Sequence, residues 1–158
     1  MKELLQYCQV LPVVHFEPGD VVLSEGSKTG IIYILKEGKA EVTKRNIQVT
    51  LIDEPGAVFG EISVFLDIPH MATVRSVTHS DFYIVDDPPS FLQSNTAICY
   101  HVAHLLAQRV NSVTNYLADI KEQYKDSEDH FGMIDEILDT LVYQQGDEPT
   151  PGSDRDPV

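Results

Sequence analysis

Short apolar runs alternate with glycine-bearing turns through the first half of the chain, up to about residue 86. The turns read EPGD at 17–20, SEGSKTG at 24–30, KEGK at 36–39 and DEPG at 53–56. The runs between them are rich in β-branched and aromatic residues: VVLS, IIYIL, AEVT, IQVTLI, ATVRSVT and DFYIV. Short strands at close spacing, joined by glycine turns, are typical of a β-sandwich or a β-barrel. This region is therefore predicted to be all-β, with a short helix before it over residues 2–9.

The hydrophobic period changes from about Ser90 onward, where the chain is predicted to become helical. Six apolar residues recur in steps of 4, 3, 4, 3 and 4. Their mean step of about 3.5 residues is that of a coiled-coil seam. We therefore predict a long helix over about 94–125 that forms a two-fold homodimer. Packing of this helix on its own barrel is the alternative. The seam residues are Leu106, Val110, Val113, Leu117, Ile120 and Tyr124.

Beyond residue 125 the pattern predicts one further helix and a tail. Asp126 or Ser127 can cap a helix whose first turn is acidic, as a helix N-terminus favours. Residues 126–145 are thus expected to form an acidic amphipathic helix. Residues 146–158 are polar, contain prolines and lack apolar periodicity, so they are predicted to be a disordered acidic tail. The apolar face of the helix consists of Phe131, Ile134, Leu138 and Leu141.

The charge balance bears on the expected partners. The chain has 25 acidic and 11 basic residues, a formal net charge of -14. Such a charge repels phosphate backbones and anionic lipid, so neither nucleic acid nor a membrane surface is an expected partner. No apolar run approaches the roughly 18 residues of a membrane span, and no signal-peptide pattern is present. A cytoplasmic protein with reduced thiols at Cys8 and Cys99 is expected.

The histidines do not form a recognisable metal or catalytic site. His101 and His104 can share one helix face, but no carboxylate or cysteine completes a ligand set. His15, His70 and His79 lack the spacing of a metal-dependent β-barrel enzyme. No phosphate-binding P-loop, CxxC pair or Ser-His-Asp order is present. We therefore expect no metal, no catalytic residue and a non-enzymatic function.

Two stretches carry a resemblance to a known family. They are FEPGDVVLSEGSKTGIIYILKEGKAEV at 16–42 and FGEISVFLDIPHMATV at 59–74. With the long helix that follows, the chain resembles the cyclic-nucleotide-binding domain of the catabolite-activator and protein-kinase-A regulatory family over about residues 12–125. The resemblance implies an α+β fold, in which a β-jelly-roll barrel precedes a long dimerisation helix. The residues after 125 are too few and too acidic for a DNA-binding domain, so a stand-alone, bacterial-type member is expected.

The second stretch, residues 59–74, matches the family's phosphate-binding cassette. By this resemblance Gly60 permits close backbone approach, and the amides of Glu61 and Ile62 face the cyclic phosphate at a helix start. Glu61 matches the acid that accepts a hydrogen bond from the ribose 2′-hydroxyl. Ser63 occupies a small-residue position that lines the turn. The implied ligand is cyclic AMP or cyclic GMP, with no other cofactor.

The second half departs from the family at one position. Ala72 and Thr73 match the family's small residues, but His70 stands where the family has its phosphate-clamping arginine. Met71 stands where some members present a hydroxyl. A histidine offers one hydrogen bond where an arginine fork offers two, and it is largely neutral at pH 7. Thr114 on the long helix is a candidate contact for the base.

Three hypotheses follow for the function. In the first, a cyclic nucleotide at Glu61 and His70 biases a hinge around residues 86–97 and thereby the long helix. A bound phosphate would then raise the pKa of His70, so that binding tightens as pH falls. Arg75 is not expected to compensate, because strand alternation places it on the opposite face. In the second, the domain is a degenerate protein-interaction module. In the third, the pocket accepts an unphosphorylated nucleoside or another nucleotide.

Overall fold

The computed structural model describes residues 2–123, 134–135, 137–138 and 141, in two compact units that comprise residues 1–102 and 103–158. Each unit is considered by itself. The elements in chain order are α1 (Lys2–Cys8), β1 (Val13–Phe16), β2 (Val21–Leu23), β3 (Ile32–Glu37), β4 (Ala40–Lys44), β5 (Ile47–Ile52), β6 (Val58–Phe59), α2 (Glu61–Leu66), β7 (Thr73–Ser76), β8 (Ser80–Val85), α3 (Pro88–Ser94) and α4 (Thr96–Gln123).

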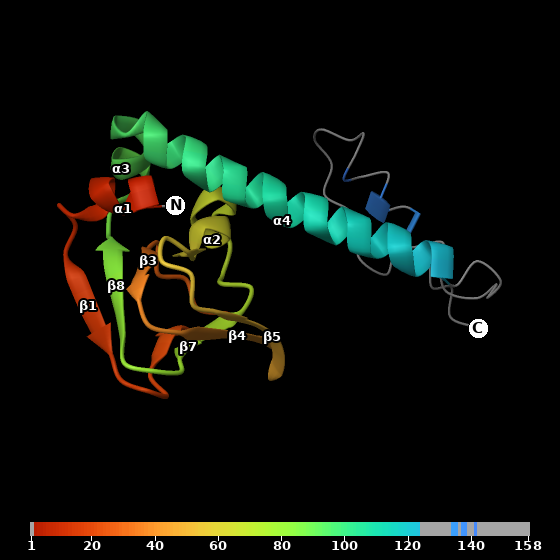
Figure 1. Cartoon of the computed structure of the whole chain (residues 1–158), viewed down its shortest axis with the longest axis horizontal. Coiled ribbons are helices and arrows are strands. Elements are labelled where there is room, and N and C mark those ends of the chain that lie inside the picture. The colour runs from red at the N-terminus through yellow and green to blue at the C-terminus, as the bar shows by residue number, and fades with distance from the viewer. Residues whose placement is uncertain (1, 124–133, 136, 139–140, 142–158) are drawn as a thin grey trace. The chain divides into compact units, whose positions relative to one another are not determined.

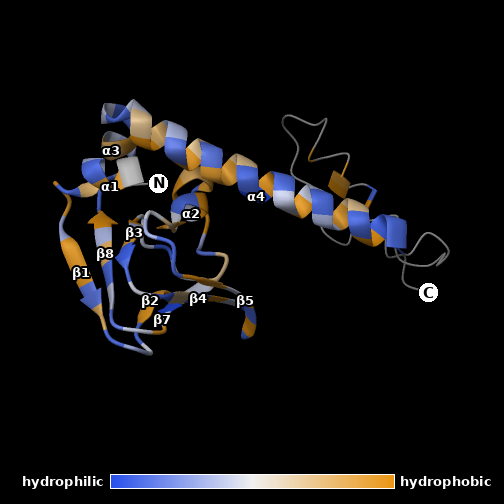
Figure 2. Cartoon of the chain, viewed as in Figure 1, coloured by the Kyte–Doolittle hydropathy of each residue, from blue (hydrophilic) through white to orange (hydrophobic). Residues whose placement is uncertain are grey.

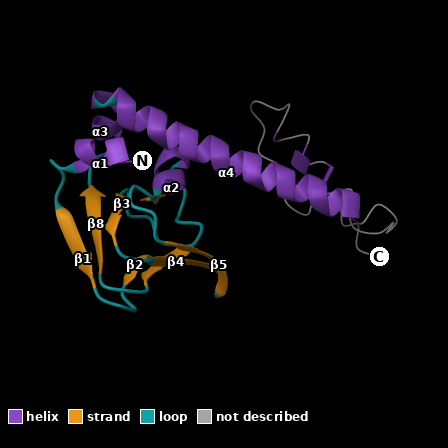
Figure 3. Cartoon of the chain, in the orientation of Figure 1, coloured by secondary structure: helices purple, strands orange, loops and turns teal. Residues whose placement is uncertain are grey.

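The eight strands form two four-stranded antiparallel sheets (Figures 1 and 3). The strand orders are β1-β8-β3-β6 and β2-β7-β4-β5. The predicted jelly-roll fold with a following long helix is confirmed. The barrel, however, is not closed, because no ladder joins the edge strands of one sheet to those of the other. The architecture of the described strands is therefore a β-sandwich.

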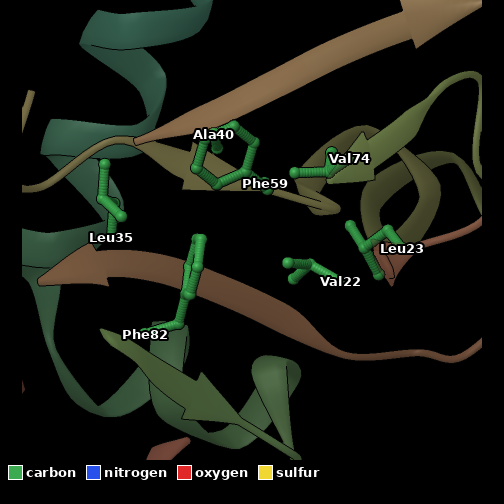
Figure 4. Packing of buried hydrophobic residues seen from close by; sticks show 7 residues of the cluster. All are labelled: Val22, Leu23, Leu35, Ala40, Phe59, Val74 and Phe82. Atoms are coloured by element: carbon green, nitrogen blue, oxygen red, sulfur yellow. The ribbon is translucent and has the colours of Figure 1, made fainter. Parts of the chain in front are cut away.

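The hydrophobic core lies between the two sheets. Both sheets contribute to one buried cluster, in which Phe82 of β8 is fully buried (Figure 4). Phe82 contacts Phe16 edge-to-face, with ring centroids 5.5 Å apart, and Phe59 at 5.9 Å. Such aromatic pairs stabilise a core beyond the area that they bury. The cluster comprises Val22, Leu23, Leu35, Ala40, Phe59, Val74 and Phe82.

Two consecutive helices follow β8, and local sequence explains where each begins. Asp87 accepts a hydrogen bond from the Ser90 amide at the start of α3, where Pro88 needs no amide partner. The side chain of Asn95 caps α4 by accepting from the Ile98 amide at 3.2 Å. Asn95 itself is extended, so α3 and α4 are separate helices.

Helix α4 confirms the predicted long helix, since it runs 28 residues from Thr96 to Gln123. Tyr124, the last residue of the predicted seam, lies outside the described residues. So does most of the predicted C-terminal helix, although its five described positions are helical, and so does all of the predicted tail. Among the described residues, no helix is both long and apolar enough to cross a membrane.

Candidate ligand-binding site

Helix α2 starts at a turn that only glycine fits. Gly60 has a φ of +89°, in the left-handed region. A Cβ on Gly60 would lie 2.6 Å from the carbonyl oxygen of Ile31 and 3.6 Å from Cε1 of His70. The first distance is a clash, and the second places the His70 ring beside Gly60 at the start of the helix. The turn therefore brings the first residue of the α2 turn, Gly60, close to both the Ile31 carbonyl and His70.

The end of α2 is closed by its own hydrogen bonds. Asp67 adopts a left-handed conformation, with a φ of 54°, and its amide donates to the Ser63 carbonyl. The Ser63 hydroxyl donates to the Ile68 carbonyl at 2.5 Å, and the Ile68 amide donates back to the Ser63 carbonyl at 3.2 Å. Buried Ser63 thus holds the turn after the helix, and its place in a ligand site stays a prediction.

His70 is buried and held by the loop of residues 24–30. Its side chain is 4% exposed, and its Nε2 hydrogen-bonds the hydroxyl of Thr29 at 2.8 Å. Its amide donates to the Ser27 carbonyl, and its carbonyl accepts from the Gly26 amide, both at 2.8 Å. Burial lowers the pKa of His70 from its ordinary value of 6.5, because desolvation disfavours the charged ring. The residue is therefore neutral at pH 7.

Glu61 is the acid of the site. It is 3% exposed and lies in the first turn of α2, where a carboxylate is favoured by the helix dipole. Glu61 follows Gly60 in the chain, and His70 lies beside Gly60, so the start of α2 combines a buried acid with a buried neutral histidine. Ile62, the next residue of the predicted set, is half-buried on the same helix.

Two cations that could supply positive charge to the site, Lys28 and Arg75, interact with other residues. Lys28 forms an ion pair with Asp67, with its Nζ 2.7 Å from Oδ1, and also donates to the Asp67 carbonyl. Arg75 is exposed on β7 between buried Val74 and Ser76, and it donates to the Gly19 carbonyl at 2.9 Å. Strand alternation thus places the Arg75 side chain on the exposed face of β7, as expected.

The remaining predicted site residues differ in their exposure and in their hydrogen-bond partners. Met71 is exposed, and Ala72 is half-buried. The hydroxyl of Thr73 accepts from the Glu25 amide at 3.0 Å. Thr114 belongs to the second unit, where its hydroxyl donates to the Val110 carbonyl one turn earlier at 2.9 Å.

An apolar groove of about 310 Å³ lies between α2, α3 and the first turn of α4. Sequence reasoning did not identify it, because its walls come from three separate helices. Nor did it identify Thr29 and Lys28, which were read only as part of a turn. The groove is lined by Val64, Phe65, Pro89, Leu92, Gln93 and Cys99. Among the described residues, no group of three or more His, Cys, Asp or Glu side chains could hold a metal ion.

Comparison with known proteins gives the family. Residues 13–89 match the cyclic nucleotide-binding domain family. The cGMP-dependent protein kinase of Eimeria tenella is 41% identical over 66 residues, which are 42% of this chain and 6% of the kinase. The cAMP-dependent protein kinase regulatory subunit of Eremothecium gossypii is 35% identical over 68 residues, 43% of this chain and 15% of that subunit. The match to the cyclic nucleotide-binding domain family thus covers residues 13–89, just under half of the chain.

Solved structures agree on the fold. The catabolite activator protein of Thermus thermophilus superposes with a TM-score of 0.65 at 17% identity, covering 76% of this chain and 59% of that one. This likeness concerns the fold alone. Because the chain spans only a small part of the two kinase-type relatives, a stand-alone, bacterial-type role stays a prediction.

Proposed function

We propose that this chain is a non-enzymatic regulatory domain that binds a cyclic nucleotide at the start of α2. The observation that carries the proposal is the turn at Gly60, which places buried Glu61 and buried His70 at the same end of a helix. The amides of Glu61 and Ile62 would receive the cyclic phosphate, and the Glu61 carboxylate would accept from the ribose 2′-hydroxyl. The similarity to a cGMP-dependent protein kinase and to a cAMP-dependent protein kinase regulatory subunit supports this ligand class.

The proposed affinity is weaker than that of a site with an arginine clamp. His70 is neutral, and its Nε2 is already bonded to Thr29. When the Thr29 hydroxyl donates to Nε2, the proton of the ring lies on Nδ1 and can make one bond to a ligand. An arginine makes two charge-assisted bonds, each contributing about 1.5–3 kcal/mol. Losing about 3 kcal/mol weakens binding about a hundredfold.

The proposed binding is also pH-dependent. Burial lowers the pKa of His70 in the free domain, whereas a bound phosphate raises it. Binding is therefore coupled to proton uptake by His70. Because a proton is taken up, affinity for a cyclic nucleotide rises as pH falls.

A second candidate ligand is an unphosphorylated nucleoside. The favouring observation is that the start of α2 holds a buried acid, Glu61, while the neighbouring Gly60 lies beside His70, whose pKa is lowered by burial. This arrangement suits a ribose and lacks a cation for a phosphate. Lys28 forms an ion pair with Asp67 at the C-terminal end of α2.

The proposed output passes through the groove between α2 and α3. Val64 and Phe65 of α2 line this groove together with Leu92 and Cys99. A ligand-induced shift of α2 would therefore change the packing of the hinge around residues 86–97. The exposed seam residues Val110 and Val113 of α4 support pairing of two copies through this helix. The competing proposal, a protein-interaction module without a small ligand, needs none of these movements.

Titration calorimetry distinguishes these proposals. The wild-type protein is titrated with cyclic AMP, cyclic GMP, adenosine and guanosine at neutral pH, beside Glu61→Gln. A cyclic nucleotide that binds wild type and is weakened by Glu61→Gln supports the first proposal. Binding of a nucleoside but not its cyclic monophosphate supports the second. No heat with any of the four ligands, from a protein that is folded by circular dichroism, rejects both and leaves the interaction module.

A further inference from the structure

Strand β5 is an apolar strand at the edge of its sheet. In the described sheet it pairs with β4 alone, so its other edge has no strand beside it (Figure 1). Ile47, Val49 and Leu51 are 69%, 62% and 44% exposed, and no residue of the strand is charged. Figure 2 colours the ribbon of β5 by hydropathy and shows hydrophobic positions along it. An exposed apolar edge is a template for pairing with another strand, and proteins usually protect it with charge.

Charges do occur, but only at the two ends of β5, and they have opposite signs. A basic turn with Lys44 and Arg45 precedes the strand, and Asp53 and Glu54 follow it, before Pro55 prevents further pairing. Arg45 has a φ of 52° in a tight hairpin turn, and its amide is held by the Glu25 carboxylate at 2.9 Å. The charges at the two ends of β5 are therefore opposite in sign, and Glu25 holds the turn before the strand.

The sequence around Val49 is complementary to itself when read in reverse. Antiparallel pairing of two copies about a two-fold axis at Val49 sets Ile47 opposite Leu51, and Val49 opposite its own copy. The same register sets Arg45 opposite Asp53. Shifting the register by two residues in either direction sets an apolar residue opposite a charged one. Shifting it by one sets apolar residues opposite polar ones.

We infer that β5 binds a second copy of this chain, edge to edge and antiparallel, about a two-fold axis at Val49. The interface is isologous, so pairing consumes both free edges and closes at two copies. The β4–β5 register shifts between Val42 and Thr43, which leaves Val49 without a partner on β4. This irregularity lies on the proposed axis, so the bends of the two copies meet symmetrically. The inference is independent of the ligand and of the α4 seam.

Sedimentation velocity of the full chain tests this inference in a Val113→Asp background, which removes the α4 seam. In this background we expect a concentration-dependent monomer–dimer equilibrium. Adding Val49→Lys sets two lysines opposite each other on the axis and should weaken association by about tenfold or more. Val10→Lys is the matched control, because Val10 is an exposed valine, 85% accessible, far from β5 in the sequence. It should leave association unchanged.

Charge exchange gives a second test that does not alter the apolar strand. Arg45→Glu and Asp53→Arg should each weaken the dimer, and the double variant should restore it, because the opposite charges are then exchanged across the axis. Circular dichroism checks that every variant is folded. The inference is overturned if the Val113→Asp protein stays monomeric, if Val49→Lys and Val10→Lys behave alike, or if the double variant is weaker than both single variants.

Discussion

Replacing Gly60 with alanine should destabilise the domain through two separable effects. The first is conformational, since Gly60 has a φ of +89°. An alanine in the left-handed region costs about 1–2 kcal/mol, of which about 0.4–1 kcal/mol is offset by the lower entropy of the unfolded chain. The second effect is steric, since the new Cβ would lie 2.6 Å from the Ile31 carbonyl oxygen and 3.3 Å from Cδ1 of Leu23, where ordinary contacts begin at 3.4 Å.

The clash has little room to relax. The carbonyl of Ile31 immediately precedes β3, whose first residue, Ile32, is buried, and Leu23 belongs to the core cluster. Forcing atoms into a packed region costs about 1–3 kcal/mol. We therefore expect Gly60→Ala to lower the free energy of unfolding by about 2–4 kcal/mol.

Gly19→Ala is the matched control for this substitution. Gly19 has a similar φ of +96°, but a Cβ there would meet nothing within 4 Å. Only the conformational cost remains, so the expected loss is about 1 kcal/mol. The assay is urea unfolding followed by far-ultraviolet circular dichroism, because the chain contains no tryptophan. Equal losses for the two variants would refute the steric part of this reasoning.

Three further predictions follow from other parts of the structure. Because burial lowers the pKa of His70, the unfolded chain binds more protons than the folded chain just below pH 6.5. The free energy of unfolding should therefore fall as pH drops through that range, and His70→Gln should flatten this dependence. A His70→Gln protein with the pH profile of wild type would contradict the prediction. Burial raises the pKa of Cys8 to about 11, so Ellman's reagent should react rapidly with exposed Cys99 alone, and a fast phase that survives Cys99→Ser would argue otherwise. Val113→Asp should weaken a dimer formed through α4, as measured by sedimentation at micromolar concentration; a wild-type monomer there would exclude the predicted seam.

Most strands correspond to predicted apolar runs, although β1 (Val13–Phe16) is not among these runs. The run IQVTLI corresponds to β5, and IIYIL to most of β3. The two-residue strand β6 was missed, because Val58 and Phe59 are too few to alternate. They are a strand only through pairing with Ile34 and Tyr33. The pattern left a β-sandwich and a β-barrel open for a related reason, since the choice depends on edge pairing between strands far apart in the sequence.

The candidate site was predictable where its residues are adjacent in the chain. Gly60 and Glu61 stand together in the sequence, and their helix start was visible in it. The hydrogen-bond partners of His70 and Asp67 were not visible in the sequence. Thr29 lies 41 residues before His70, and Lys28 lies 39 residues before Asp67. The neutrality of His70 follows from burial, which a sequence pattern does not reveal at a polar loop position. Its proposed role remains a prediction.

The central claim is that the start of α2 binds a cyclic nucleotide through Glu61 and a histidine that must gain a proton. The most direct measurement is titration calorimetry with cyclic AMP and cyclic GMP at about pH 6 and about pH 7.5, on wild type and His70→Arg. His79→Arg, at an exposed histidine, controls for added charge. We predict that wild type binds more tightly at the lower pH, and that His70→Arg binds more tightly than both others, with little pH dependence. Equal, pH-independent affinity in all three proteins, or no binding in any, would contradict the claim.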